Sequence, residues 1–256
     1  MDRTRRDFLA WTAWGAGALA TATLIPDAAA FASRPKIKAV AFDGFPVIDP
    51  RPVAARAEAL FPGKGAELMT AWRTRQFEYT WLRTLGRRYA DFWQVTEEAL
   101  IFAAASIKLE LASDQRDRLM GTFLELKAWP EVPAALETLK KAGVRMAFLS
   151  NFTPRMLDAA LANAGLAGFF EPHLSTDRVK AFKPDPRAYQ MGVDAFKLRR
   201  TEILFVASAA WDAAGAKWFG YPTLWVNRTG APMEELGVTP DATGADLNAL
   251  VDLIEV

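Results

Sequence analysis

The sequence predicts an α/β fold, a Rossmann-like doubly wound parallel sheet with an inserted helical cap subdomain. Three runs of large and β-branched apolar residues, at 37–42, 144–149 and 203–206, carry this prediction. Each run stops at polar residues, and helix-patterned stretches separate the runs. Such runs are typical of buried parallel strands, and polar groups after them face the crevice where α/β folds bind ligands. The pattern therefore favours an enzyme.

The predicted cap covers residues 49–128, which contain no strand-like run. Apolar residues recur at a spacing of three to four between residues 65 and 85, as in an amphipathic helix, and Gly86 follows as a stop. Thr96 and Ser113 each precede acidic residues, so we expect them to be the N-caps of two further helices.

The predicted core comprises residues 33–48 and 129–256, because helix and strand patterns alternate from residue 129 onward. Short turns and right-handed crossovers would bring the loops after the strands to one edge of the sheet. The expected helices, which mostly begin at proline or end near glycine, are 133–142, 154–164, 186–196 and 213–219, and a further strand is expected at 222–226.

Residues 1–32 are predicted to be a leader peptide. Arg5 and Arg6, in the stretch T-R-R-D-F-L, resemble a twin-arginine export signal, and A-F-A before Ser33 has the small-x-small form of a signal peptidase site. We therefore expect export by the twin-arginine (Tat) machinery, cleavage between Ala32 and Ser33, and a periplasmic location. A membrane anchor is the alternative, but the apolar stretch is richer in Ala and Gly than the ~20 strongly apolar residues of a spanning helix.

Composition excludes several classes of site. The formal net charge is +1, with 31 Lys and Arg against 30 Asp and Glu, which gives no electrostatic argument for nucleic acid or a membrane surface as a partner. The absence of cysteine excludes disulfides, thiolate metal sites and cysteine nucleophiles. The single histidine, His173, cannot build a histidine metal cluster, and its place after Pro172 argues against a Ser-His-Asp triad.

Chemically active side chains follow each of the three strand-like runs. Asp43 follows the first run, where a firmly held carboxylate can act as a nucleophile and form an ester that water later cleaves. Ser150 and Asn151 follow the second, where a hydroxyl and an amide can hold an anionic oxygen. Lys183 lies in F-K-P-D-P, and Asp212 follows the third run. A lysine between two carboxylates lowers their pKa values and keeps Asp43 ionised.

In this order and at these strand ends, the motifs resemble the haloacid dehalogenase superfamily. The cap stretch 72–83, W-R-T-R-Q-F-E-Y-T-W-L-R, resembles the type II (L-)2-haloacid dehalogenase branch in particular. Tyr189 six residues after Lys183, the segment W-D-A at 211–213 and W-V-N-R-T-G at 225–230 also match that branch. The resemblance spans nearly all of the chain after the leader.

The resemblance implies an (S)-2-haloacid dehalogenase, a hydrolase that acts on carbon–halide bonds. Such an enzyme converts short 2-haloalkanoic acids to 2-hydroxy acids through an aspartyl ester, with inversion at C2. It further implies a small 2-halo carboxylate as the partner, no metal or other cofactor, and a homodimer, since dimers are common in that branch.

The roles implied by the resemblance fall to eleven residues. Catalysis would rest on Asp43 as the nucleophile, Lys183 and Asp212 as the groups that tune it and position water, and Arg73 as a receiver of the departing halide. The residues that would contact the substrate, the halide or the nucleophile are Ser150, Asn151, Tyr189, Phe45, Phe77, Phe92 and Trp211. Without the resemblance, Arg73 is predicted to lie on a solvated helix face, and Phe77, Phe92 and Trp211 to be core residues.

The chain departs from the branch at two strand ends. The turn D-G-F-P-V-I-D at 43–49 is one residue shorter than the usual form, lacks its threonine, and contains Pro46, which has no backbone N–H. Ala207 and Ala209 stand where the branch has a serine and an asparagine that hold the lytic water. Two alternatives therefore stay open: a protein of this fold that binds a small carboxylate with impaired turnover, and a phosphatase. Phe45 counts against the phosphatase, because phosphatases carry a second Asp there to protonate the leaving alcohol.

Overall fold

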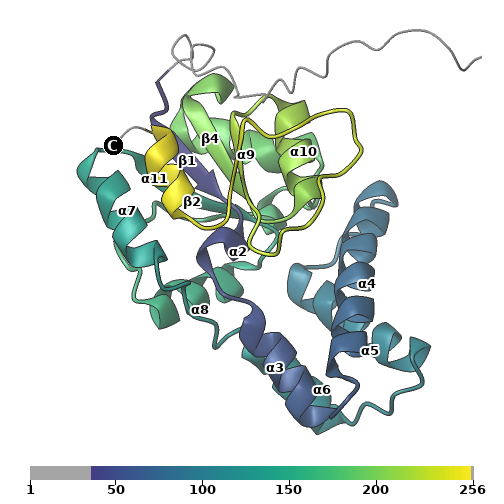
Figure 1. Cartoon of the computed structure of the whole chain (residues 1–256). Helices are drawn as coiled ribbons and strands as arrows, with labels where there is room; N and C mark the ends of the chain where they lie inside the picture. The colour runs from purple at the N-terminus through teal and green to yellow at the C-terminus, as the bar shows by residue number, and fades with distance from the viewer. Residues whose placement is uncertain (1–35, 255–256) are drawn as a thin grey trace, which may run out of the picture. The chain divides into compact units, whose positions relative to one another are not determined.

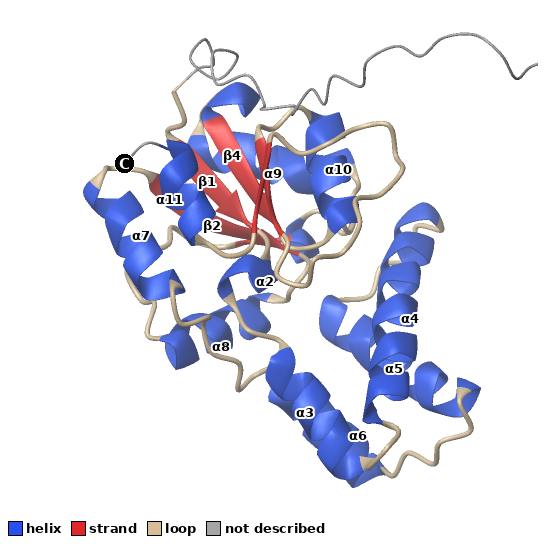
Figure 2. Cartoon of the chain, viewed as in Figure 1, coloured by secondary structure: helices blue, strands red, loops and turns tan. Residues whose placement is uncertain are grey.

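The computed structural model describes residues 36–254, so the predicted leader and its cleavage point lie outside the described residues. Six parallel strands form one sheet in the order β3-β2-β1-β4-β5-β6 (Figures 1 and 2). This arrangement confirms the predicted doubly wound parallel sheet. The strands are β1 (Ala39–Phe42), β2 (Arg145–Ser150), β3 (Leu174–Ser175), β4 (Ile203–Ala207), β5 (Thr223–Val226) and β6 (Ala242–Gly244).

Helices cover both faces of the sheet, which makes three layers (Figure 1). Alternate residues of β1 bury into different clusters: Val40 and Phe42 into one, Ala39 and Ala41 into the other. This alternation is the two-residue period of a strand buried on both faces. The first face packs against α7 (Val132–Lys141), α8 (Pro154–Ala164) and α11 (Asn248–Ile254), and the second against α9 (Pro186–Phe196) and α10 (Ala210–Phe219).

Four helices, α3 to α6, lie between α2 and α7 in the chain and pack on one another, α4 on α3 and α5, and α6 on α3 and α5. The chain enters and leaves this segment at one point, since Ile48 and Ala128 form an antiparallel bridge and Asp49 N–H donates to Lys127 O at 2.9 Å. We propose residues 49–128 as the cap. Its helices are α3 (Arg51–Leu60), α4 (Gly65–Leu85), α5 (Phe92–Ser106) and α6 (Ser113–Thr122).

The two expected N-caps in this segment were wrong. Helix α5 begins four residues before Thr96, at Phe92, and Asp91 caps it by accepting a hydrogen bond from Gln94 N–H at 2.9 Å. Thr96 is buried inside the helix, where its hydroxyl donates to Phe92 O at 2.6 Å and accepts from Gln76 Nε2 at 2.7 Å. Ser113 is the first residue of α6 rather than its cap.

The ends of the central strands coincide at one edge of the sheet. Phe42 lies opposite Phe148 of β2 and Val206 of β4 in the parallel register. Asp43 is therefore level with Leu149 and Ala207, and the next residue on each neighbouring segment is a serine, Ser150 or Ser208. The remaining short elements are α2 (Gly44–Val47), directly after Asp43, and the 3₁₀ turns η1 (Thr176–Arg178) and η2 (Arg200–Glu202).

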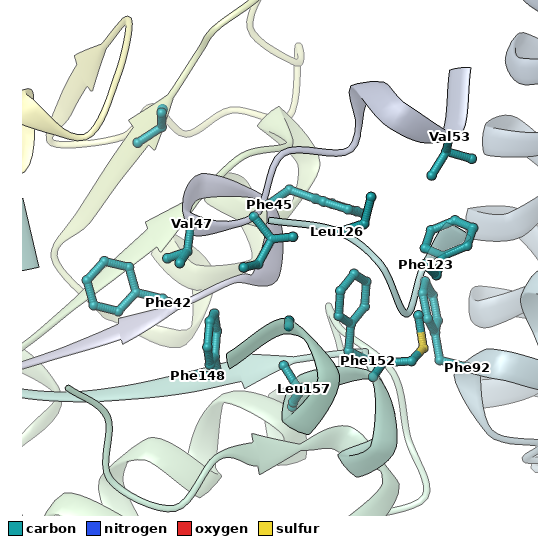
Figure 3. Close-up of a cluster of buried hydrophobic side chains, with 14 of the residues drawn as sticks. Phe42, Phe45, Val47, Val53, Phe92, Phe123, Leu126, Phe148, Phe152 and Leu157 are labelled. Atoms are coloured by element: carbon teal, nitrogen blue, oxygen red, sulfur yellow. The ribbon is translucent and has the colours of Figure 1, made fainter. Parts of the chain in front are cut away.

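The apolar face of the core continues into the cap helices. Figure 3 shows Phe45, Phe92, Phe123 and Phe152 within one cluster of buried side chains that also includes Phe42 of β1. This continuity holds the cap side chains next to the carboxyl edge of the sheet. Within residues 36–254, no helix is both long enough and apolar enough to cross a membrane.

Candidate active site

Asp43 is fixed at the edge of the sheet by its backbone and by both carboxylate oxygens. Its N–H donates to Val206 O at 2.9 Å, and the residue is the N-cap of the short helix α2. Oδ1 accepts a hydrogen bond from Lys183 Nζ at 2.8 Å. Oδ2 accepts from Ser208 Oγ at 3.0 Å and from Phe45 N–H at 3.4 Å. The carboxylate therefore has little freedom to rotate, as a nucleophile requires.

Lys183 joins Asp43 to Asp212. Its side chain is 1% exposed and its Nζ lies 2.5 Å from Asp212 Oδ2. Asp212 was expected at the end of the third strand segment, but it lies in the first turn of α10, because that helix begins at Ala210, two residues earlier. The helix N-terminus brings a partial positive charge toward this carboxylate.

Tyr189 lies behind Asp212 rather than at a substrate surface. It is fully buried in α9, and its hydroxyl donates to Asp212 Oδ1 at 2.7 Å. Its hydrogen bond fixes the orientation of Asp212, and burial with the charges of Asp212 and Asp43 raises the pKa of Tyr189.

The pKa values of the two carboxylates are pushed apart. Burial opposes ionisation of Asp43, but the charge and hydrogen bond of Lys183, the Gly44 backbone and the Ser208 hydroxyl hold the pKa of Asp43 below its usual value. Burial, helped by the charge of Asp43, outweighs Lys183 and raises the pKa of Asp212 to about 6, so the expectation that the lysine lowers both pKa values was wrong for Asp212. Burial lowers the pKa of Lys183, but the charges of Asp212 and Asp43 outweigh it and raise that pKa. Asp43 is thus suited to nucleophilic attack, and Asp212 to accept a proton near neutral pH.

Ser150 and Asn151 present hydrogen-bond donors beside Asp43. Ser150 Oγ accepts from Phe152 N–H at 3.2 Å, which leaves the hydroxyl proton to donate. Asn151 Oδ1 accepts from Lys183 N–H at 3.1 Å, so its amide NH₂ is the end that can donate to a ligand. Gly44 brings the two strand ends together, since a Cβ built on it would lie 3.4 Å from Ser150 Oγ.

Arg73 of α4 lies against aromatic rings rather than in solvent. Its guanidinium carbon is 4.9 Å from the Phe45 ring centre and 4.8 Å from that of Phe77. Burial lowers the pKa of Arg73, while the charge of Asp43 opposes this. No carboxylate among residues 36–254 forms an ion pair with it. The expectation of a solvated Arg73 was therefore wrong, because the cap folds this face of α4 over the sheet edge.

Two tryptophans complete the aromatic side of the site. The Trp211 ring lies 5.0 Å from Phe77 and 5.5 Å from Trp81, measured between ring centres. The indole N–H groups of Trp211 and Trp81 are buried and find no hydrogen-bond acceptor among the described residues. Phe92, which the resemblance placed at the halide, packs at 5.7 Å from Phe152 and 6.1 Å from Phe182.

Residues outside the shortened nucleophile turn hold its carbonyl groups. Trp129 Nε1 donates to Phe45 O at 3.0 Å, and a guanidinium nitrogen of Arg228 donates to Pro46 O at 3.0 Å. Arg228 also pairs with Glu131 at 2.5 Å and lies over the Trp129 ring. Sequence reasoning did not assign Trp129, Arg228 or Ser208 to the site, although the register of Ser208 one residue past β4 was a usable signal.

The sheet edge beside Asp43 lacks the serine and asparagine side chains that the type II branch has there. Ala207 ends β4 and Ala209 is the N-cap of α10 without a side-chain hydrogen bond. Within the part of the chain that the structure describes, no three His, Cys, Asp or Glu side chains gather where they could hold a metal ion. The arrangement can support attack by Asp43 on a small anionic substrate that carries a leaving group stable as an anion.

Known proteins share both the sequence and the fold. The family model for haloacid dehalogenase-like hydrolases matches residues 15–220. An (S)-2-haloacid dehalogenase of Pseudomonas sp. (strain YL) is 45% identical over 86% of this chain and 95% of that protein. The haloacetate dehalogenase H-2 of Moraxella sp. (strain B) is 41% identical over 86% of this chain and 99% of that protein.

Solved structures agree with these matches. An L-2-haloacid dehalogenase crystal structure superposes with a TM-score of 0.84 at 42% identity, covering 87% of this chain and 100% of that one. An L-2-haloacid dehalogenase from Xanthobacter autotrophicus, solved with chloropropionic acid covalently bound, has a TM-score of 0.78 at 34% identity, covering 86% of this chain and 98% of that one. The chain therefore belongs to the haloacid dehalogenase superfamily and, within it, to the L-2-haloacid dehalogenase family.

Proposed function

We propose that this protein hydrolyses short 2-haloalkanoic acids to 2-hydroxy acids through an ester on Asp43. The observation that carries the proposal is the environment of the Asp43 carboxylate. It is ionised by contact with Lys183 and faces Arg73, a half-buried cation without an ion-pair partner among the described residues. An S_N2 displacement of halide needs a firmly held anion on one side of the carbon and a place for a departing anion on the other.

In the first half-reaction, Asp43 attacks C2 from the face opposite the halogen, which inverts that carbon. The Ser150 hydroxyl and neighbouring backbone N–H groups bind the substrate carboxylate. The Arg73 guanidinium and the Asn151 amide stabilise the departing halide, together with the aromatic edge of Phe92. These positive groups act on charge that grows in the transition state, which is where electrostatic stabilisation accelerates a reaction.

In the second half-reaction, water cleaves the ester. Asp212, whose pKa burial raises to about 6, is ionised at neutral pH and accepts a proton from that water. Lys183 and Tyr189 hold the Asp212 carboxylate on both of its oxygens, at 2.5 Å and 2.7 Å. The surrounding rings of Phe45, Phe77 and Trp211 form the apolar wall around the alkyl group of the substrate.

A second candidate has a specific observation in its favour. Ala207 and Ala209 supply no side-chain hydrogen bond at the sheet edge beside Asp43. Loss of one positioning donor commonly costs about 3 kcal/mol in barrier height. A protein that binds a small carboxylate, or alkylates on Asp43 and then turns over poorly, is therefore the alternative.

Halide release from 2-chloropropionate, measured with and without EDTA, separates the candidates. Release that resists the chelator supports metal-free dehalogenation. An ester on Asp43 that persists in intact-mass spectra supports impaired turnover, and carboxylate binding without either ester or halide supports the binding protein. Chelator-sensitive release of phosphate from a phosphoester would contradict both and support a phosphatase.

We further propose that residues 1–32 direct export by the Tat machinery to the periplasm and that the exported chain forms a homodimer. The sequence at Arg5 and Arg6 and the A-F-A stretch before Ser33 support export. Periplasmic fractionation of the wild type and an Arg5→Lys/Arg6→Lys variant tests the route. Retention of the variant in the cytoplasm and an N-terminus at Ser33 in the wild type are the expected results, and light scattering of the exported chain reads the oligomeric state.

A further inference from the structure

The two oxygens of the Asp43 carboxylate lie in different surroundings. Oδ1 has one donor, the Lys183 ammonium at 2.8 Å. Oδ2 has two, the Ser208 hydroxyl at 3.0 Å and the Phe45 N–H at 3.4 Å. A carboxylate oxygen offers two lone pairs in the plane of the group. Both in-plane lone pairs of Oδ2 are therefore engaged, whereas Oδ1 keeps one that can be directed at a substrate carbon.

We propose that Oδ1 is the attacking oxygen and that Ser208, with the Phe45 N–H, forms the oxyanion hole for Oδ2 when the ester is hydrolysed. This inference rests on the proposed function and assigns a role to Ser208 in its second step. After alkylation, Oδ2 is the carbonyl oxygen of the ester. Its two donors are already in place, so they need no rearrangement as charge develops.

The bonds and charges balance under this assignment. In the first step an Oδ1 lone pair forms the bond to C2, and the halide leaves with the electron pair of the carbon–halogen bond. Water then bonds to Cγ and gives a proton to Asp212, while the Cγ–Oδ2 π pair moves onto Oδ2 between its two donors. The Cγ–Oδ1 bond breaks, and Oδ1 leaves with a proton from Lys183, which Asp212 restores. The proton left on the new carboxyl group of Asp43 goes to solvent.

Ser208 is suited to this role because the residues around it lack a suitable hydrogen-bond donor. The flanking Ala207 and Ala209 carry no polar side chain, and Pro46 has no N–H to offer. Ser208 directly follows β4 and its hydroxyl contacts the nucleophile, and its own backbone is held by Trp225 Nε1, which donates to Ser208 O at 3.1 Å. The Trp225 contact does not depend on the Ser208 side chain, so removal of the hydroxyl leaves this hydrogen bond in place.

The test separates the two half-reactions in the full exported chain with 2-bromopropionate as the probe. Rapid quenching gives the rate of the bromide burst, and intact-mass spectra give the fraction of ester. Ser208→Ala is expected to slow ester hydrolysis about 100-fold while the burst rate changes a few-fold at most, so the ester accumulates. Ser208→Thr keeps the hydroxyl and is expected to recover most of the hydrolysis rate. Ser106→Ala, a serine replacement in the cap outside the site, is the control for a general effect on the fold.

Three outcomes would overturn the inference. One is a Ser208→Ala variant that slows the burst as much as the hydrolysis, which would assign Ser208 to the orientation of the attacking carboxylate. Another is a Ser208→Ala variant that hydrolyses the ester at the wild-type rate, or a Ser208→Thr variant that hydrolyses it no faster than Ser208→Ala does. The third is a wild-type chain that releases no bromide and forms no ester, which removes the proposed function as well; the first two leave that function standing.

Discussion

The site has two halves with opposite electrostatic character. In the ionic half, Asp43, Lys183, Asp212 and Tyr189, every charged group has a partner between 2.5 Å and 2.8 Å away. In the aromatic half, Arg73, Phe77, Trp81 and Trp211, one guanidinium lies over rings, and two buried indole N–H groups have no acceptor among residues 36–254. Buried polar groups are usually satisfied within the protein, so these two donors set the aromatic half apart from the ionic half, in which every charged group has a partner. The ionic half is prepared for bond making, and the aromatic half for the charge that leaves.

The largest effect is expected from removal of the nucleophile. Asp43→Asn should lower the rate of halide release by roughly 10⁴-fold or more, because an amide oxygen at this position cannot form the ester. Halide release and intact mass measure the loss. Asp49→Asn, which replaces a carboxylate six residues along the chain that pairs with Arg51, is the matched control and should keep most of the activity. Substantial halide release by Asp43→Asn would place the attacking group elsewhere.

The two halves should differ in what they contribute to stability. Lys183→Met leaves two buried carboxylates facing each other without their cation, and it should lower the free energy of unfolding at pH 7 by about 3–5 kcal/mol. Arg73→Met removes a half-buried cation that has no ion pair among the described residues, and it should change that free energy by about 1 kcal/mol or less. Urea unfolding followed by circular dichroism measures both. Equal losses would contradict the contrast between the halves.

The sequence predicted the parallel sheet and helices after Asp43, and the resemblance named most of the residues that the structure brings together at the sheet edge. Apolar runs and glycine stops are local patterns, so strand and helix positions could be read from them within a few residues. Asp43 and Ser208 are 165 positions apart, and no local pattern records the hydrogen bond that joins them. Likewise, the burial of Arg73 depends on how α4 lies over the sheet edge, which the spacing of apolar residues along the helix does not specify.

The two wrongly predicted N-caps also show that local sequence patterns do not record tertiary contacts. Thr96 has the residue type and the acidic neighbours of an N-cap, but its hydroxyl bonds to Phe92 O one turn back and to Gln76 of α4. Tertiary contact between α4 and α5 therefore decides the role of Thr96, and residue type does not. Strand β6 and helix α11 had no strong pattern and were not predicted.

The ionic half should also produce a pH dependence that the aromatic half lacks. Burial raises the pKa of Asp212, to about 6 while Asp43 is charged and less far in the ester, where Asp43 carries no charge. That carboxylate therefore binds a proton in acid, and below its pKa ester hydrolysis should slow about tenfold per pH unit. The pKa of Asp43 is lowered, so alkylation should continue over the same range and ester should accumulate. The bound proton also makes the folded chain relatively more stable as the pH falls from 6 toward 3.8, the ordinary value. Quenched single turnovers between pH 4 and 8 measure the hydrolysis rate, and a rate that is flat across that range would remove Asp212 as the base.

The smallest effect is expected from a single donor in the aromatic half. Trp211→Phe keeps an aromatic ring next to Phe77 and removes only the indole N–H that has no acceptor among the described residues. The indole N–H has almost no exposed surface, so a halide can meet it only if the ring shifts. The alkylation rate should therefore fall by about threefold at most, with ester hydrolysis unchanged. Trp218 lies on the same helix and is 54% exposed. Trp218→Phe is therefore the control and should change neither rate. A fall of tenfold or more would instead show that the indole N–H reaches the departing halide beside Arg73, Asn151 and Phe92.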